Sequence, residues 1–396
     1  MRNILAFVIP LSLSIYSCTK FEPKPPKDEE ILDGPIEGLS YEEQLQFLKG
    51  DIAFNDDVFT VEKGLGPLFV STSCGSCHAG DGKGHPFTTL TRFGQYDSTG
   101  NKFLHLGGPQ LQNRAIPGYI PEQIPSGATY SKITPPANTG LGYLEAVTDA
   151  DILALADPAD VDGDGISGRP NWTIPAMYLD IPVNSISNNG KYIGRFGKKA
   201  AAFNLLHQTV LAYNQDMGIT SIYEPYDTYD QLEKDPEVSN QTIHDVVFYL
   251  QTLKTPRQRN TDNENIKEGK RLFIQSDCAK CHIPELKTGY SKIEALSYKT
   301  FYPYTDMLLH DMGEGLDDGY TEGSALSSEW RTPALWGMGL SKNSQGGTYY
   351  LLHDGRATSI HQAIMLHGGE ATNSRNKYSS LSVEQRNQIE KFLESL

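Results

Sequence analysis

The sequence predicts an all-α protein of two helical domains, with a large loop-rich insertion in the first domain. Three observations lead to this prediction. Apolar residues recur at helical spacing in Val238 to Lys254, in Glu268 to Gln275 and in Val383 to Leu396. A polar stretch that follows Pro256 separates the first of these segments from the other two. The same five-residue pattern, C-x-x-C-H, occurs once on each side of that stretch.

Length and composition agree with two domains. The chain has 396 residues, of which 38% are hydrophobic, and this suits two cores. We place the first domain at residues 34–256 and the second at residues 257–396. The formal net charge of -15 argues against nucleic acid as a partner, because a phosphate backbone would be repelled.

The chain begins with a segment that resembles the signal peptide of a bacterial lipoprotein, residues 1–17. Arg2 precedes an apolar run from Ile4 to Ile15, and the small residue Ser17 stands directly before Cys18. The run is too short to span a membrane. The sequence therefore predicts that Cys18 carries a lipid. The alternative is an ordinary cleaved signal peptide that happens to contain a cysteine.

Residues 18–33 form the next element, which we expect to be a flexible tether. The segment is rich in proline and charge and poor in large apolar side chains. Such a spacer would keep the folded part clear of a membrane surface. We therefore expect a location in the cell envelope, with a lipid anchor and the protein facing the periplasm.

The two five-residue patterns carry the chemistry. Each pairs two cysteines with a histidine directly after the second, and the residues are Cys74, Cys77 and His78, and Cys278, Cys281 and His282. In this spacing the cysteines can add to the two vinyl groups of one haem while the histidine binds its iron. A zinc site or a redox dithiol is the alternative. Neither needs histidine at that position, so we expect two covalently bound haem c groups, one in each of two cytochrome c-like domains.

Between Thr88 and Pro170 the sequence is irregular and rich in glycine and proline, with a helical pattern only at Tyr143 to Leu155. This is the predicted insertion. At its end, Asp160, Asp162 and Asp164 alternate and Gly165 follows, as in the first half of a calcium loop. The twelfth position holds Asn171 instead of glutamate, so a calcium site and an ordinary solvated loop both remain open.

Several further segments resemble the di-haem oxidoreductase family, whose members are also labelled thiol oxidoreductases. In chain order they are Gly163 to Asn171, Gly194 to Gly197, Asp216 to Thr220, Leu309 to Gly313, Trp330 to Pro333 and His353 to Ala357. The overall plan is more distantly similar to that of bacterial dihaem cytochrome c peroxidases. The resemblance implies one haem that relays electrons and another that reacts with peroxide.

The resemblance also suggests ligands for the iron atoms. When the peroxidase pattern is aligned with His353-Asp354-Gly355, the position of its methionine ligand falls on His367. His367 would then make the second haem bis-histidine. His310 and Met312 are alternatives. For the first haem no ligand can be transferred, although three histidines are possible, and we expect an open or displaceable iron there. These histidines are His85, His105 and His207.

A stretch from Gln208 to Met217 resembles the distal pocket of the peroxidases. Asp216 stands near the position of their glutamate, so we expect Asp216 to move protons and Gln208 to assist it. The peroxidases carry a tryptophan just before this stretch, where this chain has Phe196, Gly197 and Lys198. The tryptophans that could replace it are Trp172, Trp330 and Trp336.

These observations predict a dihaem oxidoreductase of the cytochrome c peroxidase type. We expect it to take electrons from a periplasmic donor protein and to reduce a small oxidant such as hydrogen peroxide. The alternatives are an electron carrier without catalysis and the oxidation of a protein partner. A thiol exchange role has little support, because haem attachment would leave no free cysteine pair.

Overall fold

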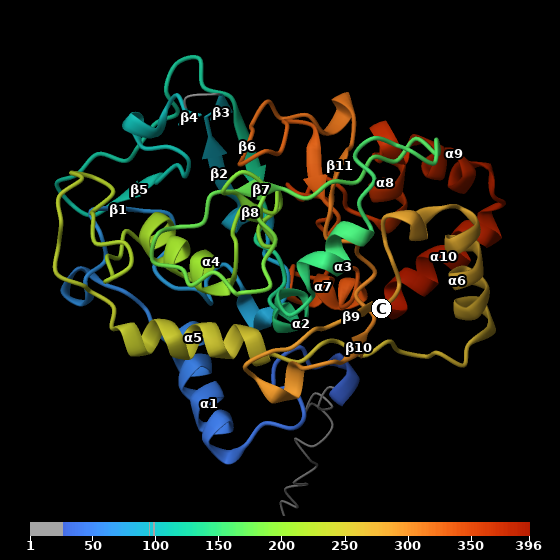
Figure 1. The fold of residues 1–396 in the computed structure, drawn as a ribbon, viewed down its shortest axis with the longest axis horizontal. Helices are drawn as coiled ribbons and strands as arrows, with labels where there is room; N and C mark the ends of the chain where they lie inside the picture. Colours follow the sequence, from blue (N-terminus) through green and yellow to red (C-terminus); the bar gives the residue numbers. More distant parts are fainter. Residues whose placement is uncertain (1–26, 95, 98–99) are drawn as a thin grey trace, which may run out of the picture.

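Two pairs of crossed helices, one in each half of the chain, organise the structure. It is a computed structural model and describes residues 27–94, 96–97 and 100–396. In the first half, α1 (Tyr41–Asn55) packs against α5 (Asn240–Thr252). In the second half, α6 (Glu264–Gln275) packs against α10 (Val383–Ser395), as Figure 1 shows. The same construction therefore occurs twice.

A glycine lies at each of these helix crossings. A Cβ atom added at Gly50 of α1 would lie 2.1 Å from the carbonyl oxygen of Asp245 on α5. A Cβ atom added at Gly269 of α6 would lie 2.0 Å from the carbonyl oxygen of Gln388 on α10. Real Cβ atoms do not approach that closely, so the backbones of both pairs meet only because these residues lack a side chain.

The helices begin where their sequences provide N-caps. Ser40 and Glu43 form a capping box at the start of α1, and Ser382 and Gln385 form one at the start of α10. Ser239 caps α5 by accepting a hydrogen bond from the backbone of Thr242. The helices expected at residues 238–254, 268–275 and 383–396 are thereby confirmed, with α6 beginning four residues earlier than expected.

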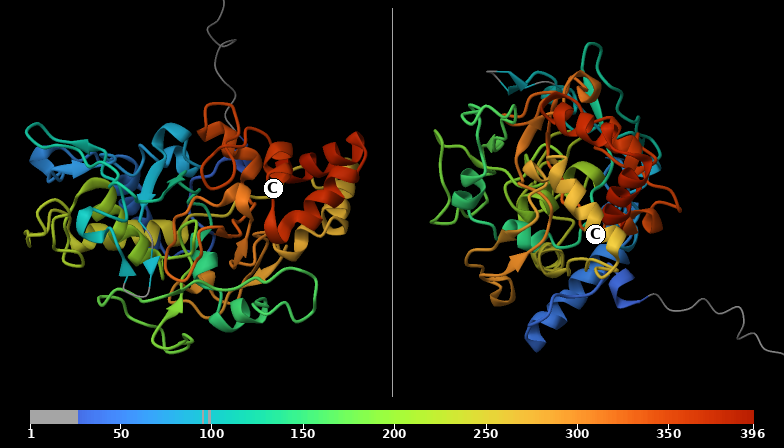
Figure 2. Two further views of the ribbon diagram at one scale, coloured as in Figure 1. Left: turned by 90° about the horizontal axis from the view of Figure 1, so that it is seen from above. Right: turned by 90° about the vertical axis from the view of Figure 1, so that its right-hand side faces the viewer.

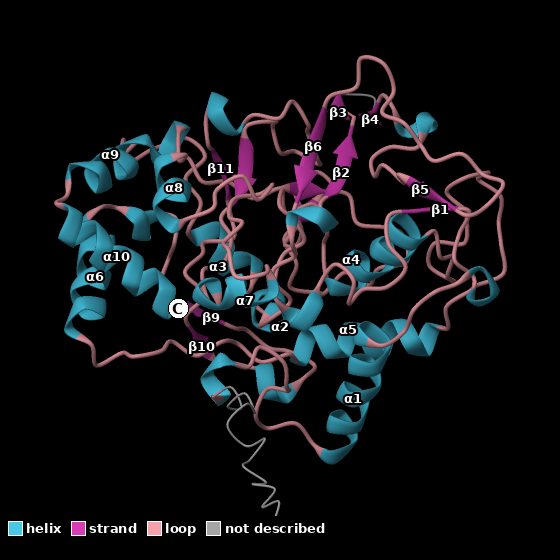
Figure 3. Cartoon of the chain, turned by 180° about the vertical axis from the view of Figure 1, so that it is seen from behind, coloured by secondary structure: helices cyan, strands magenta, loops and turns pink. Residues whose placement is uncertain are grey.

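The prediction of an all-α fold is wrong. Twelve short strands pair in six antiparallel two-stranded sheets within the described residues, and loops join them (Figure 3). Strands of two to four residues are too short to show an alternating pattern, so periodicity could not predict them. The pairs are β1 (Leu68–Phe69) with β5 (Arg114–Ala115), β2 (Leu90–Phe93) with β6 (Tyr130–Ile133), β3 (Tyr96–Asp97) with β4 (Gly100–Asn101), β7 (Trp172–Thr173) with β8 (Tyr192–Ile193), β9 (Leu286–Lys287) with β10 (Thr300–Phe301), and β11 (Leu309–Asp311) with β12 (Glu329–Arg331).

The shorter helices lie between these elements. The expected helix near residues 143–155 is two helices, α2 (Leu141–Glu145) and α3 (Asp149–Ala154). The other short helices are α4 (Leu205–Leu211), α7 (Ser341–Ser344), α8 (Ile360–Met365) and α9 (Thr372–Ser380). In residues 27–94, 96–97 and 100–396, no helix combines the length and the apolar character that crossing a bilayer requires. The predicted signal peptide, Cys18 and most of the tether lie outside the described residues.

Of the four hydrophobic clusters among the described residues, two form the main cores. One lies around α5, and the other lies between α6 and α10. The first core also takes in side chains from beyond residue 256, including Phe301 and Trp336, whose rings lie 5.9 Å apart. The strands β9 and β10 thus come back to α2, at the lower centre of Figure 1, where the ring centroids of Tyr143 and Phe301 lie 5.4 Å apart. The right-hand view of Figure 2 shows α1 projecting from the rest of the chain. The domain boundary at residues 256 and 257 stays a prediction.

Candidate functional site

One continuous cavity of about 1180 Å³ reaches both C-x-x-C-H motifs. Its walls include His78 and His282 together with the cysteines of both motifs. Pockets for a single small molecule have volumes of roughly 300–1,000 Å³. The cavity therefore has room for more than one ordinary ligand, and it extends from the first half of the chain into the second.

The motif histidines are held in the same way in both halves. The Nδ1 atom of His78 lies 3.0 Å from the carbonyl oxygen of Pro136, and that of His282 lies 3.0 Å from the carbonyl oxygen of Tyr304. A carbonyl can only accept, so Nδ1 carries the proton and Nε2 keeps its lone pair. Burial lowers the pKa of each histidine to about 4, so both rings are neutral. Both are suited to bind a metal through Nε2.

The crossed helices place an aromatic ring against each of these histidines. The ring of Phe54, on α1, lies 5.9 Å from the ring of His78, and that of Phe273, on α6, lies 6.3 Å from the ring of His282. Each phenylalanine follows the glycine of its helix crossing by four residues. The two motifs are thus supported by equivalent parts of the fold.

The cysteines of both motifs are free thiols, and all four line the cavity. Burial raises the pKa of Cys74 and of Cys278 to about 12. Zinc ligation and thiol exchange both use the thiolate, which such an environment disfavours. Paired buried thiols beside a neutral histidine fit the attachment of one haem at each motif.

His367 follows the end of α8 and lines the cavity with His282. Its Nδ1 atom lies 2.7 Å from the carbonyl oxygen of Ala363, so its Nε2 lone pair is also free. The ring lies near enough to His282 for a charge on it to lower the pKa of His282. His367 therefore has a free Nε2 lone pair, as the two motif histidines do, and can bind a metal in the same way.

His310, in contrast, has both ring nitrogens engaged by carboxylates. Its Nε2 atom lies 2.8 Å from Asp306, and its Nδ1 atom lies 2.7 Å from Glu370. Burial alone would lower the pKa of His310, but the two carboxylates outweigh burial and raise it well above its usual range. A ring that donates from both nitrogens has no lone pair for iron. Met312, the other alternative ligand for the second iron, lines the cavity.

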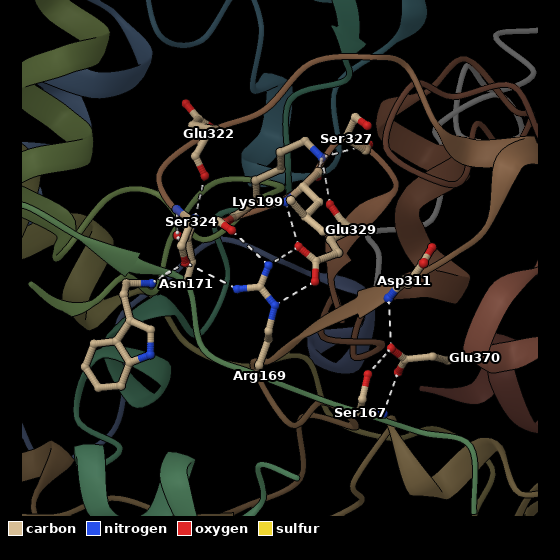
Figure 4. Close-up of polar contacts among 12 residues, drawn as sticks. Ser167, Arg169, Asn171, Lys199, Asp311, Glu322, Ser324, Ser327, Glu329 and Glu370 are labelled. Atoms are coloured by element: carbon tan, nitrogen blue, oxygen red, sulfur yellow. Dashed lines mark hydrogen bonds and ion pairs between the residues drawn. The ribbon is translucent and has the colours of Figure 1, made fainter. Parts of the chain in front are cut away.

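Glu370 also holds the loop that precedes β7. It accepts hydrogen bonds from the backbone and the hydroxyl of Ser167, at 3.0 and 2.7 Å, and one from the backbone of Asp311 (Figure 4). The same carboxylate thus joins the His310 strand to a loop more than 140 positions earlier in the sequence. This contact fixes His310 as a structural imidazolium.

The two predicted catalytic residues lie on the cavity wall near the first motif. Gln208 is on α4, and the chain continues from α4 into a π-helical turn, Ala212–Asp216, which ends at Asp216. Short π-helical turns occur often at functional sites. Burial raises the pKa of Asp216 to about 7, although the nearby charge of Arg92 opposes this rise. Asp216 can therefore exchange a proton near neutral pH.

Arg92, on β2, completes this wall and was missed by the sequence analysis. Its guanidinium forms an ion pair with Glu322 at 2.7 Å and donates to Tyr320 at 3.2 Å and to Gln215 at 3.3 Å. These partners are more than 100 positions away in the sequence, so no local pattern could reveal them. Arg92 brings a fixed positive charge close to Asp216.

Of the three histidines considered for the first iron, only His207 lines the cavity. Its Nδ1 atom accepts a hydrogen bond of 3.2 Å from the backbone N–H of Phe203, so the proton of the neutral ring is on Nε2. His207 is thus a hydrogen-bond donor and has no free lone pair at Nε2. His85 accepts from the backbone of Phe87 outside the cavity, and His105 is exposed.

All three candidate tryptophans line the cavity, and Trp330 has the most constrained surroundings. The ring of His353 stacks on it with centroids 3.7 Å apart, and the Lys199 ammonium lies 3.8 Å from the ring centroid. Lys199 donates to three backbone carbonyls, those of Leu326, Ser327 and Glu329. The ammonium is satisfied, and its charge disfavours loss of an electron from the indole.

The predicted calcium loop is arranged differently from the expectation. Asp157, rather than Asp164, lies with Asp160 and Asp162, and Asp164 pairs with Lys280 at 2.7 Å. Asn171 is turned away from the loop: its amide donates to the carbonyls of Lys199 and Glu322 and accepts from Ser324, as Figure 4 shows. Calcium binding at this loop stays a prediction.

One of three comparisons with known proteins identifies a family. A search of curated proteins found no match. Among solved structures, hydrazine synthase from Kuenenia stuttgartiensis is 14% identical, with a TM-score of 0.40 over 100% of both chains, a likeness that carries no conclusion. The model of a family described as "Di-haem oxidoreductase, putative peroxidase" matches residues 130–396. The match spans more than half of the chain and includes the second motif, so the chain belongs to the di-haem oxidoreductase family.

Proposed function

We propose that this protein is a dihaem c-type cytochrome in which the second haem relays electrons and the first reduces a small oxidant such as hydrogen peroxide. One observation carries the proposal. Both motifs line a single cavity. The cavity wall near the second motif includes His367, whose Nε2 lone pair is free, and the wall near the first motif includes Asp216, which can exchange a proton. The two ends of the cavity thus differ in chemistry although their protein supports are equivalent.

In this proposal Cys74 and Cys77 hold one haem and Cys278 and Cys281 hold the other. His78 and His282 bind the iron atoms through Nε2. When bound, each haem supplies an iron that changes oxidation state and that can bind a small molecule where a coordination position is open. Support comes from the neutral rings of both histidines and from the carbonyls that orient them.

At the second motif, His367 would occupy the remaining position. Its free Nε2 and its proximity to His282 support this role. Two histidine ligands leave no place for an oxidant, so this end is suited to electron transfer alone. Bis-histidine ligation also gives a lower potential than histidine and methionine, because a thioether ligand raises the potential. The electrons would come from a periplasmic donor protein.

At the first motif, the chain provides acid and base groups instead of a ligand. Reduction of one hydrogen peroxide to two waters takes up two electrons and two protons. Asp216 would accept a proton from one peroxide oxygen and return it to the other, which then leaves as water. Arg92 would stabilise the negative charge that develops on the leaving oxygen, and Gln208 would orient the peroxide. The two electrons come from the donor protein, and the protons come from solvent.

A location in the cell envelope completes the proposal. A lipid on Cys18 would hold the protein at a membrane facing the periplasm, where its donor is also found. The features that support it are the apolar run before Cys18 and the proline-rich tether after it. Labelling with a radioactive fatty acid tests the anchor, because Cys18→Ser should abolish incorporation and leave the haem motifs intact.

Peroxide consumption with a reduced small cytochrome as donor tests the catalytic part. Asp216→Asn should lower kcat by roughly 10²–10⁴-fold, the contribution of a positioned acid–base group. Asp311→Asn is the matched control, because Asp311 is exposed and does not line the cavity. The ferric protein should show a high-spin signal from the first iron. Wholly low-spin spectra together with no peroxide turnover would favour the non-catalytic electron carrier.

A further inference from the structure

Three cationic side chains line the cavity that reaches both motifs. They are Lys83, which follows the first motif, Lys198, in the loop after β8, and Arg331, at the end of β12. The backbone N–H of Arg331 donates to the carbonyl of Lys198 at 2.9 Å, and its Nε donates to the carbonyl of Gly197 at 3.1 Å. The positive charges of Lys83 and Lys198, and of Lys198 and Arg331, lie close enough to oppose each other.

These cations differ from two other cations of the interior, which have carboxylate partners. Arg92 pairs with Glu322 and Arg195 pairs with Asp149, both within ion-pair distance. For Lys83, Lys198 and Arg331, no carboxylate of the described residues lies within 4.0 Å. Lys83 reaches one carbonyl, that of Leu352, at the long distance of 3.4 Å. Asp354 acts on the two ammonium groups and Asp306 acts on the guanidinium only from beyond ion-pair distance, and burial lowers the pKa of all three groups. A carboxylate in direct contact would stabilise their charged forms.

The position of the three cations identifies the anion. Lys198 lies near enough to His78 for its charge to lower the pKa of that histidine. Burial lowers the pKa of Arg331, and the negative charge of Asp306 opposes this shift. Asp306 also contacts His310, which lies beside Cys281 of the second motif. Lys198 and Arg331, whose backbones are hydrogen-bonded, thus link the surroundings of the first motif to those of the second. A haem carries two carboxylate side chains on one edge, and these are the acids that occupancy of both pockets would bring to this point.

We propose that Lys83, Lys198 and Arg331 form a shared site for the propionate carboxylates of the haems, on the wall of the cavity that both motifs line. The inference rests on the haem attachment proposed above. Each carboxylate would accept charge-assisted hydrogen bonds from ammonium and guanidinium groups.

A positive charge beside a haem edge stabilises the ferrous state, because reduction removes one positive charge from the iron. Lys198→Met and Arg331→Met should therefore each lower the equilibrium constant for reduction of at least one haem about tenfold. For a one-electron couple this corresponds to about 59 mV in midpoint potential. Lys198→Arg should stay within about threefold of the wild type. Lys49→Met is the control, because Lys49 is exposed on α1, away from the cavity.

Spectroelectrochemical titration of the holoprotein measures these potentials, and resonance Raman spectra report the propionate contacts directly. The propionate-bending bands should shift in Lys198→Met and Arg331→Met and remain unchanged in Lys49→Met. Unchanged potentials in both variants would overturn the proposal. A potential shift without any change in the propionate bands would also overturn it, because the cations would then act only through space.

Two further measurements keep the outcomes distinct. A pyridine haemochrome assay first confirms two haems per chain, and its failure would refute the proposed function rather than this site. Exchange of chloride for succinate at constant ionic strength should leave the wild-type potentials unchanged. A dependence on succinate would mean that the cations take a carboxylate from solution, which contradicts occupancy by propionates.

Discussion

Replacing Gly269 with alanine should destabilise the second half of the protein by separating α6 from α10. The new Cβ atom would lie 2.0 Å from the carbonyl oxygen of Gln388 and 2.8 Å from the Cβ atom of Phe392, where ordinary contacts begin near 3.4 Å. Neither atom can rotate away, so the helices must part by more than 1 Å. Overpacking of this kind costs about 1–3 kcal/mol.

Alanine is about 1 kcal/mol more favourable than glycine inside a helix, and this offsets part of the cost. Because the clash is with backbone, we take the upper end of the range, which leaves a net loss of about 2 kcal/mol. A loss of this size lowers Tm by roughly 4–8 °C for a unit of 150–250 residues. Separation of the helices should also move Phe273 away from His282, and the absorption spectrum of the second haem should report this change.

Thermal and urea unfolding of the haem-loaded protein measure the effect. Gly315→Ala is the matched control, because a Cβ atom added at Gly315 meets nothing within 4 Å. The control should unfold at the wild-type temperature or slightly above it. A Gly269→Ala variant as stable as the control would refute the assignment of this glycine as the contact that sets the distance between the helices.

Three other predictions concern buried charges and ligands. Asp149→Ala leaves the guanidinium of Arg195 buried without its partner at 2.6 Å and should cost about 3–5 kcal/mol in urea unfolding, whereas an unchanged midpoint would contradict the pairing. Burial raises the pKa of Asp216 in the folded state to about 7, from an ordinary value of 3.8, so wild-type stability should fall as pH rises through this interval. Asp216→Asn removes this dependence and should gain more stability at pH 8 than at pH 5; an equal gain at both values would refute the shift. His367→Met should raise the midpoint potential of the second haem, and potentials unaffected by this change would exclude His367 as a ligand.

Local patterns in the sequence predicted the parts of the site that depend on neighbouring residues. The five-residue motifs needed no tertiary information, and the structure brings both to one cavity. Helices with capping residues and regular apolar spacing, such as α5 and α10, were also predictable. The position of His367 came from a resemblance, and its orientation could be known only from the contact with Ala363.

The rest depends on contacts between distant segments. Arg92 gains its role from Glu322, and His310 becomes an imidazolium only because Glu370 reaches it. Neither pairing leaves a periodic or local signal. Asn171 stands at the twelfth position of the aspartate-rich segment, and only the folded chain shows that its amide bridges Lys199, Glu322 and Ser324.

The single cavity shared by both motifs has a consequence for the biogenesis of the protein. The cavity of about 1180 Å³ is lined by side chains of both hydrophobic cores, among them Phe54 and Phe273. A prosthetic group bound at one motif therefore also supports the walls around the other. A chain that carries only one of the two haems should be less stable and more sensitive to proteases than the complete protein. Attachment at the two motifs should therefore be under joint selection.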